Sequence, residues 1–157
     1  SSRLEEILGI PTVNLGTIAS AVDVNCWNSL IFHNNFPMPK AVVHIWPCLS
    51  RFSKPQGDTY ISILSKNKRY KHDILYNWSE RSIDYIEMNR QLWKNKLPYS
   101  ESSFTPSVNN CKDESIIPLE FIDRARDVNE VTGGHPGIES AHKAANSIAQ
   151  DLLQKGI

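Results

Sequence analysis

The chain has 157 residues, enough for one domain over residues 1–157 with a substantial core and too few for two full domains. Hydrophobic residues make up 40% of it and charged residues 22%, which excludes the composition of an intrinsically disordered chain. The 17 basic and 17 acidic side chains leave no net charge, so the sequence lacks the positive field of nucleic-acid-binding proteins and we expect no nucleic-acid partner.

Membrane and metal binding are not expected either. No apolar run approaches the roughly 18 residues of a membrane span, and the opening residues lack the apolar region of a signal peptide. Cys26, Cys48 and Cys111 are far apart and form no CxxC pair, which predicts reduced thiols instead of disulfides or a zinc site. We therefore expect a soluble protein without a metal or cofactor.

The first part of the chain predicts helices alternating with strands. A helix ends at Gly9, a residue type that commonly terminates helices. A short buried strand is predicted over residues 10–16, closed by Gly16, and a second helix from Ser20 to Phe32. The apolar run Ala41–Trp46 predicts a strand covered on both faces, which we expect near the centre of a parallel sheet.

The pattern weakens over residues 47–77, which we interpret as an excursion or insertion on the functional face. Apolar residues return only at Thr59–Leu64. The basic run Lys66–Lys71 could contact an anion, but such runs are usually solvated surface. A helix is then predicted from an N-cap at Ser79 to a point before Pro98.

The last third predicts a loop, a strand and a helix. The polar stretch Tyr99–Ser115 is typical of a long loop, and Ile116–Ile122 of a short strand. A helix starting at Pro136 or Gly137 carries the clearest buried stripe of the chain. The stripe consists of Ile138, Ala141, Ala145, Ile148, Ala149 and Leu152.

This alternation predicts an α/β fold with three layers, a parallel sheet flanked by helices on both faces. Ligands of such sheets bind beyond the carboxyl ends of the strands. The candidate site loops are therefore Gly16–Ser20, Pro47–Arg51 and Asp123–Gly137.

The third of these loops carries the candidate chemistry, because Asp123, Asp127 and His135 all precede the last helix. A catalytic imidazole needs a carboxylate that fixes its tautomer and stabilises its charged form, as in an acyl-transfer triad. An aspartate and a histidine also share loops without any catalytic role, so spacing alone leaves both interpretations open.

Two segments resemble SGNH (GDSL-type) hydrolases. Residues Ile122–Asp127 and His135–His142 resemble the last motif of that family, in which an aspartate and a histidine precede a C-terminal helix. Residues Ser2–Gly16 resemble its first helix and second strand. The resemblance implies a flavodoxin-like fold and hydrolysis of small acyl esters, such as acetyl groups on glycans.

The same resemblance implies roles for individual residues. His135 is the expected general base, with Asp127 or Asp123 as the carboxylate that orients it. Gly16 is the expected oxyanion-hole donor through its backbone N–H.

Three departures from the family pattern are visible in the sequence. The Gly-Asp-Ser block with the nucleophilic serine is absent from this chain, and the Gly-x-Asn-Asp block is replaced by Pro47–Arg51. Thr132 stands three residues before His135, where the family has its aspartate. These departures favour an alternative, a non-catalytic structural or binding module such as a phage structural protein. For either function, the reduced cysteines are consistent with a cytoplasmic or virion-associated protein.

Two other histidines are expected to be structural. His44 lies inside an apolar strand and is expected to be a hydrogen-bonded core residue. His142 lies opposite the buried stripe of the last helix and is expected to face solvent.

The family's first strand lies near the middle of its sheet, so its absence would leave Val13–Leu15 and Val42–Ile45 with an exposed apolar edge. We expect a further strand to cover that edge. It could come from residues upstream of Ser1, from Thr59–Leu64 or from a neighbouring subunit.

Overall fold

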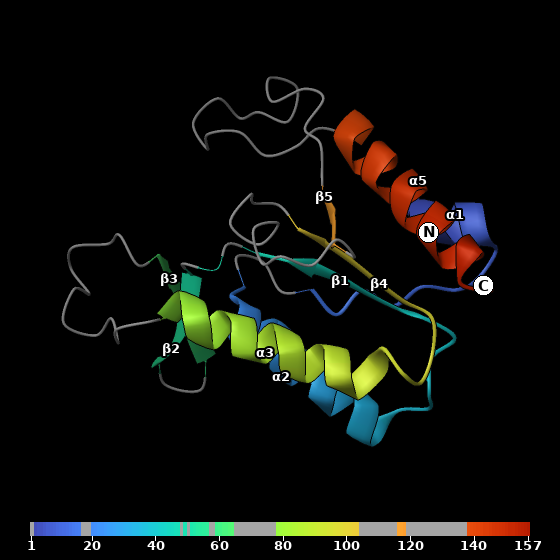
Figure 1. Ribbon diagram of the computed structural model, residues 1–157. Coiled ribbons are helices and arrows are strands. Elements are labelled where there is room, and N and C mark those ends of the chain that lie inside the picture. The colour runs from blue at the N-terminus through green and yellow to red at the C-terminus, as the bar shows by residue number, and fades with distance from the viewer. Residues whose placement is uncertain are drawn as a thin grey trace.

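The computed structural model describes residues 2–16, 20–47, 49, 51–56, 59–64, 78–103, 116–118 and 138–157. Helices and strands alternate along this part of the chain (Figure 1). In chain order they are α1 (Arg3–Leu8), α2 (Val22–Asn35), β1 (Val42–Trp46), β2 (Arg51–Gln56), β3 (Thr59–Leu64), α3 (Trp78–Trp93), β4 (Tyr99–Ser103), β5 (Ile116–Pro118) and α5 (Ile138–Gln154).

The main sheet contains three parallel strands in the order β1-β4-β5. Val42 of β1 pairs with Tyr99 of β4, and Glu101 of β4 pairs with Ile116 of β5. The prediction that Ala41–Trp46 forms a strand is confirmed, but its central position is wrong. Among the described strands β1 lies at an edge, and β4 occupies the centre.

Helices cover both faces of this sheet (Figure 1). Val22 of α2 and Ile86 of α3 pack with Trp46 and Leu49 in a buried cluster on one face. On the other face α5 packs against β4 and against α1. The chain is therefore an α/β protein with a small parallel sheet.

The helices at the two ends of the chain follow their sequence signals. Ser2 caps α1 by accepting the amide of Glu5 at 3.2 Å, and Gly9 ends the helix in the left-handed conformation, at φ 65°. The predicted stripe of α5 is buried at Ala145, Ile148, Ala149 and Leu152. The stripe begins later than predicted, since Ile138 is 70% exposed.

The two inner helices are close to their predictions. Helix α2 begins two residues later than expected, at Val22, and ends three residues later, at Asn35. Helix α3 starts at Trp78, so Ser79 lies inside the helix and does not cap it.

The predicted strand over residues 10–16 is wrong. These residues form no strand, and Val13 is 73% exposed. A strand needs a hydrogen-bonded neighbour, and no described strand pairs with this segment. The side chain of Asn14 instead accepts the amide of Gly16 at 2.8 Å, which is a local Asx turn.

The predicted loop over Tyr99–Ser115 is also wrong at its start. Residues 99–103 form β4, and all five side chains are buried. Their polarity concealed a central strand, because serines at positions 100 and 102 are small enough to lie beneath α5, while the other face carries a buried hydrogen-bond network. The remainder, residues 104–115, lies outside the described residues.

Residues 51–64 form a separate antiparallel hairpin of β2 and β3, with Arg51 paired to Leu64. Thr59–Leu64 therefore pairs with β2 and does not cover the edge of β1, which corrects one of the three sources expected for a covering strand. The hairpin is tied to α2 by a 3.1 Å hydrogen bond from Ser53 to the carboxylate of Asp23.

Lys155 ties the end of α5 to the start of β4. Its ammonium donates to the carbonyl oxygen of Tyr99 at 2.8 Å and to Asp151 at 2.6 Å. We expect Lys155→Met to lower the free energy of unfolding by about 1 kcal/mol, measured by urea denaturation. Lys94→Met is the matched control, because no described residue bonds its ammonium. Equal losses in the two variants would contradict the role of Lys155.

Candidate functional site

The carboxyl ends of β1, β4 and β5 meet at one edge of the sheet, because the three strands are parallel. Helix α5 runs antiparallel to them, since its last turn is bonded to the first residue of β4 (Figure 1). Its N-terminus at Ile138 therefore points toward the carboxyl edge. Pro118, the last residue of β5, also lies there, so both flanks of residues 119–137 are on the carboxyl side of the sheet.

The predicted catalytic residues His135, Asp127 and Asp123 lie between these flanks but outside the described residues. Their roles stay predictions.

Gly16, the predicted oxyanion donor, is described and exposed. Its backbone N–H donates to Asn14 Oδ1, and the carbonyl oxygen of Leu15 accepts from Asn28 of α2 at 3.0 Å. A Cβ at position 16 would lie 2.9 Å from Asn14 Oδ1, so the tight turn favours glycine there. An oxyanion would have to displace the Asn14 side chain to use this donor.

The β1–β2 connection, residues 47–50, leaves the sheet at the same edge. Leu49 of this connection is buried, with 5% exposure. Its carbonyl oxygen accepts a 3.1 Å hydrogen bond from Ser82 of α3. Leu49, within the predicted site loop Pro47–Arg51, is therefore held against α3 near the carboxyl edge.

A buried hydrogen-bond network lies between the sheet and α3, and the sequence analysis missed it. Its centre is Glu101 of β4, which is 2% exposed. Arg90 Nε donates to both oxygens of Glu101, at 3.0 and 2.8 Å, and Arg90 Nη2 lies 2.7 Å from Oε2. Tyr99 donates its hydroxyl to Oε1 at 2.6 Å, and Trp46 donates its indole N–H to the same oxygen at 3.2 Å. The carboxylate of Glu87, which is half-exposed, forms a second ion pair with Arg90.

His44 extends this network through the hydroxyl of Tyr99. Because the hydroxyl of Tyr99 donates to Glu101, it is free to accept from His44 Nδ1, 3.0 Å away. The ring of His44 also stacks on Trp46, with ring centres 4.5 Å apart. The prediction of a hydrogen-bonded core histidine is confirmed.

The pKa values reflect burial and the charge of Glu101. Burial lowers the pKa of His44 to about 4, which keeps the imidazole neutral. Burial also raises the pKa of the Tyr99 hydroxyl, and the Glu101 charge raises it further. Burial opposes the charged form of Arg90, but hydrogen bonds and charge from Glu101 outweigh it and raise the pKa of Arg90.

This network is suited to a structural role, because Glu101 accepts from three side chains and Tyr99 is disfavoured from ionising. The residues that could have indicated it are Arg90 and Glu101, whose charges fall within an otherwise buried helix face and strand.

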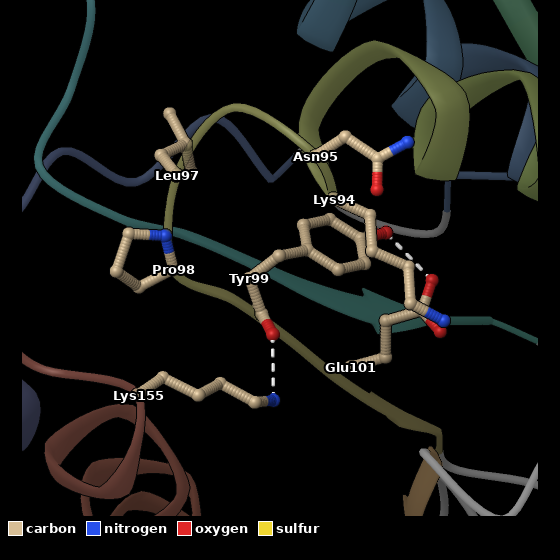
Figure 2. A pocket seen from close by; sticks show the side chains of 7 residues that line it. All are labelled: Lys94, Asn95, Leu97, Pro98, Tyr99, Glu101 and Lys155. Atoms are coloured by element: carbon tan, nitrogen blue, oxygen red, sulfur yellow. Dashed lines mark hydrogen bonds between the residues drawn. The ribbon is translucent and has the colours of Figure 1, made fainter.

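A shallow pocket of about 500 Å³ lies at the opposite end of β4 (Figure 2). Figure 2 shows the ammonium of Lys155 directed at the carbonyl oxygen of Tyr99, and the hydroxyl of Tyr99 directed at Glu101. The lining is completed by Lys94, Asn95, Leu97 and Pro98. Its location at the amino end of the strand separates it from the predicted catalytic edge.

The other sequence candidates fall in two groups. His142 is exposed, as predicted, and Cys26 is a buried free thiol whose pKa is raised by burial. The basic run Lys66–Lys71, Cys48 and Cys111 lie outside the described residues.

In the part of the chain that the structure describes, no three His, Cys, Asp or Glu side chains are grouped to hold a metal ion. No helix among the described residues has the length and hydropathy to cross a membrane. Comparison of the chain with protein-family models, curated proteins and solved structures gives no match.

Proposed function

We propose that the chain is an SGNH-like α/β domain, with the flavodoxin-like three-layer arrangement of that family, that hydrolyses small acyl esters such as acetyl groups on glycans. The observation that carries the proposal is the placement of both flanks of residues 119–137 at the carboxyl edge of a parallel sheet. A loop anchored in this way is where a parallel α/β sheet binds ligands. It is also the loop whose Asp and His residues resemble the family motif.

The proposed reaction needs a nucleophile from a further strand. Among the described strands β1 pairs with β4 alone, so its outer edge can accept one. On this edge strand the apolar side chain of Ile45 is 37% exposed. An exposed apolar edge is an aggregation liability unless it is covered. A strand from elsewhere in the polypeptide or from a neighbouring subunit would cover it and bring a serine to the carboxyl edge.

In the proposed mechanism His135 accepts the proton of that serine hydroxyl as its oxygen attacks the ester carbonyl carbon. Asp127, or Asp123, orients the imidazole and stabilises its charged form. The proton then passes to the departing alkoxide oxygen, and water releases the acyl group from the serine by the same route.

A non-catalytic binding module is the second candidate, and the hydrogen bond from Gly16 to Asn14 favours it. An oxyanion hole requires donors that are preorganised and unoccupied before reaction. The amide of Gly16 is instead satisfied within its own turn.

The test measures hydrolysis of p-nitrophenyl acetate by this chain and by the gene product that contains it. We expect His135→Ala to lower kcat/KM about a thousandfold, because the general base is lost. His142→Ala, the exposed histidine of α5, is the matched control and should leave the rate unchanged. Asp127→Asn and Asp123→Asn, compared with each other, identify the orienting carboxylate.

Two outcomes would support the binding module instead. One is that neither the chain nor the gene product hydrolyses the ester above the buffer rate. The other is that the two histidine variants retain the same activity.

A further inference from the structure

Described residues form the pocket at the amino end of β4, and the proposed reaction does not use it. Its volume of about 500 Å³ is within the range of roughly 300–1,000 Å³ that is typical of small-molecule sites. Its walls come from the α3–β4 turn, residues 94–98, from the start of β4, and from Lys155 just after α5 (Figure 2). A small molecule bound there would contact three different parts of the fold.

The wall that the α3–β4 turn contributes is fixed by backbone hydrogen bonds. The amides of Lys96 and Leu97 donate to the carbonyl oxygen of Trp93, at 2.9 and 3.3 Å. At the other end of the turn, the carbonyl oxygen of Pro98 accepts the amide of Val42 at 3.1 Å, which ties the turn to β1. Because this wall is ordered before a ligand arrives, binding incurs little ordering cost.

Part of the lining is apolar and consists of Leu97, Pro98 and Tyr99. Leu97 and Pro98 are half-buried, so a ligand that contacts them removes more apolar surface from water. The hydroxyl of Tyr99 already donates to Glu101 and does not require a ligand as partner. These residues therefore suit a ligand with an apolar or aromatic body.

The charged groups of the lining favour an anion. Arg90 donates to both oxygens of Glu101 and neutralises that carboxylate. The ammonium of Lys155 is shared with Asp151 at 2.6 Å. Lys94 is exposed, and no carboxylate among the described residues forms an ion pair with its ammonium. The charge that is left for a ligand to balance is therefore positive.

We propose that this pocket binds a small organic carboxylate with an apolar or aromatic body. The carboxylate pairs with the ammonium of Lys94, and the body lies against the apolar part of the lining. The inference is independent of the proposed function, because the pocket is at the opposite end of β4 from the carboxyl edge. The affinity is modest, since the pocket is shallow and the ion pair is partly in water.

Three probes separate the contributions of charge and apolar contact, in saturation-transfer NMR titrations of the gene product that contains this chain. We expect benzoate to bind with a dissociation constant of about 1 mM. Benzamide, which has the same ring without the charge, should bind about tenfold more weakly. Inorganic phosphate, measured as a competitor of benzoate, lacks the apolar body and should also bind about tenfold more weakly.

Substitutions of Lys94 locate the binding in the pocket. Lys94→Met removes the ammonium and should weaken benzoate binding about tenfold, because a charge-assisted contact is lost. Lys94→Arg keeps the charge and should bind benzoate within about threefold of the parent. Lys143→Met is the matched control, because it removes an exposed lysine of α5 that lies about 18 Å along the helix from Lys155, and it should bind as the parent does.

Several results would overturn the inference. Benzamide or phosphate that binds as tightly as benzoate would contradict a carboxylate with an apolar body as the ligand. Benzoate affinity that is unchanged in Lys94→Met, or reduced equally in Lys143→Met, would show that the pocket is not the site. Hydrolysis of p-nitrophenyl acetate bears on the proposed function alone, so the two ideas can fail separately.

Discussion

Glu101→Gln is expected to lower the free energy of unfolding by about 3 kcal/mol, the largest loss of stability expected for a substitution in this chain. The substitution keeps the size of the side chain and an oxygen that can accept from Tyr99 and Trp46. It removes the charge that balances Arg90, whose side chain is 7% exposed. The guanidinium would keep the half-exposed carboxylate of Glu87 but lose the charge of its buried partner.

Chemical denaturation of three variants checks this expectation. Glu87→Gln is the matched control, since it neutralises a carboxylate on the same arginine that is 50% exposed, and it should cost less than about 1 kcal/mol. The double variant Glu101→Gln with Arg90→Met removes both buried charges and should recover much of the loss. Similar losses from Glu101→Gln and Glu87→Gln would contradict the account of the buried pair.

Stability is expected to fall by about 3 kcal/mol as the pH drops from 6.5 to 4, because of His44. Burial lowers the pKa of His44 to about 4 in the folded chain, whereas the unfolded chain binds the same proton near pH 6.5. Between these values the unfolded state carries more protons, so acid favours unfolding. Well above pH 6.5 the imidazole is neutral in both states and its contribution is constant.

Denaturation of the parent chain and of His44→Gln across pH 4 to 7 measures this contribution. Other groups titrate in the same range, so the difference between the two chains is the informative quantity. We expect that difference to shrink steadily as the pH falls. His142→Gln, which changes an exposed histidine, should follow the parent curve, and a His44→Gln curve parallel to the parent would disprove the assignment.

The elements that could be predicted are those in which the sequence of the element itself shows which residues are buried. The stripe of α5 shows which side of the helix faces the core, and the apolar run of β1 indicates a strand covered on both faces. Gly9 marks a helix end because its left-handed backbone suits glycine. These signals need no knowledge of the rest of the chain.

The errors in the fold arose where burial depends on distant partners. Residues 10–16 are apolar enough for a strand but have no described neighbour to pair with. Residues 99–103 are polar enough for a loop, yet β4 lies between two strands with helices on both faces. Hydropathy cannot distinguish these cases, because the deciding hydrogen bonds come from other elements.

The residues of the candidate site also fall into those that the local sequence could indicate and those that it could not. His44 could be predicted as a structural residue from its strand alone. The pairing of Glu101 with Arg90 could not, because one lies on a strand and the other on a helix, and only the fold brings them within 2.8 Å. The hydrogen bond from Ser82 to the carbonyl oxygen of Leu49 could not be predicted for the same reason.

The pairing of β1 with β4 joins two distant parts of the sequence. Val42 and Tyr99 are partners across 57 positions of sequence, so closing the sheet carries a large loop entropy. A free β4 segment gains little from early collapse, since three of its five residues are serines. Formation of the ladder therefore depends on contacts made by other elements, such as the packing of α2 against α3, and not on β4 alone.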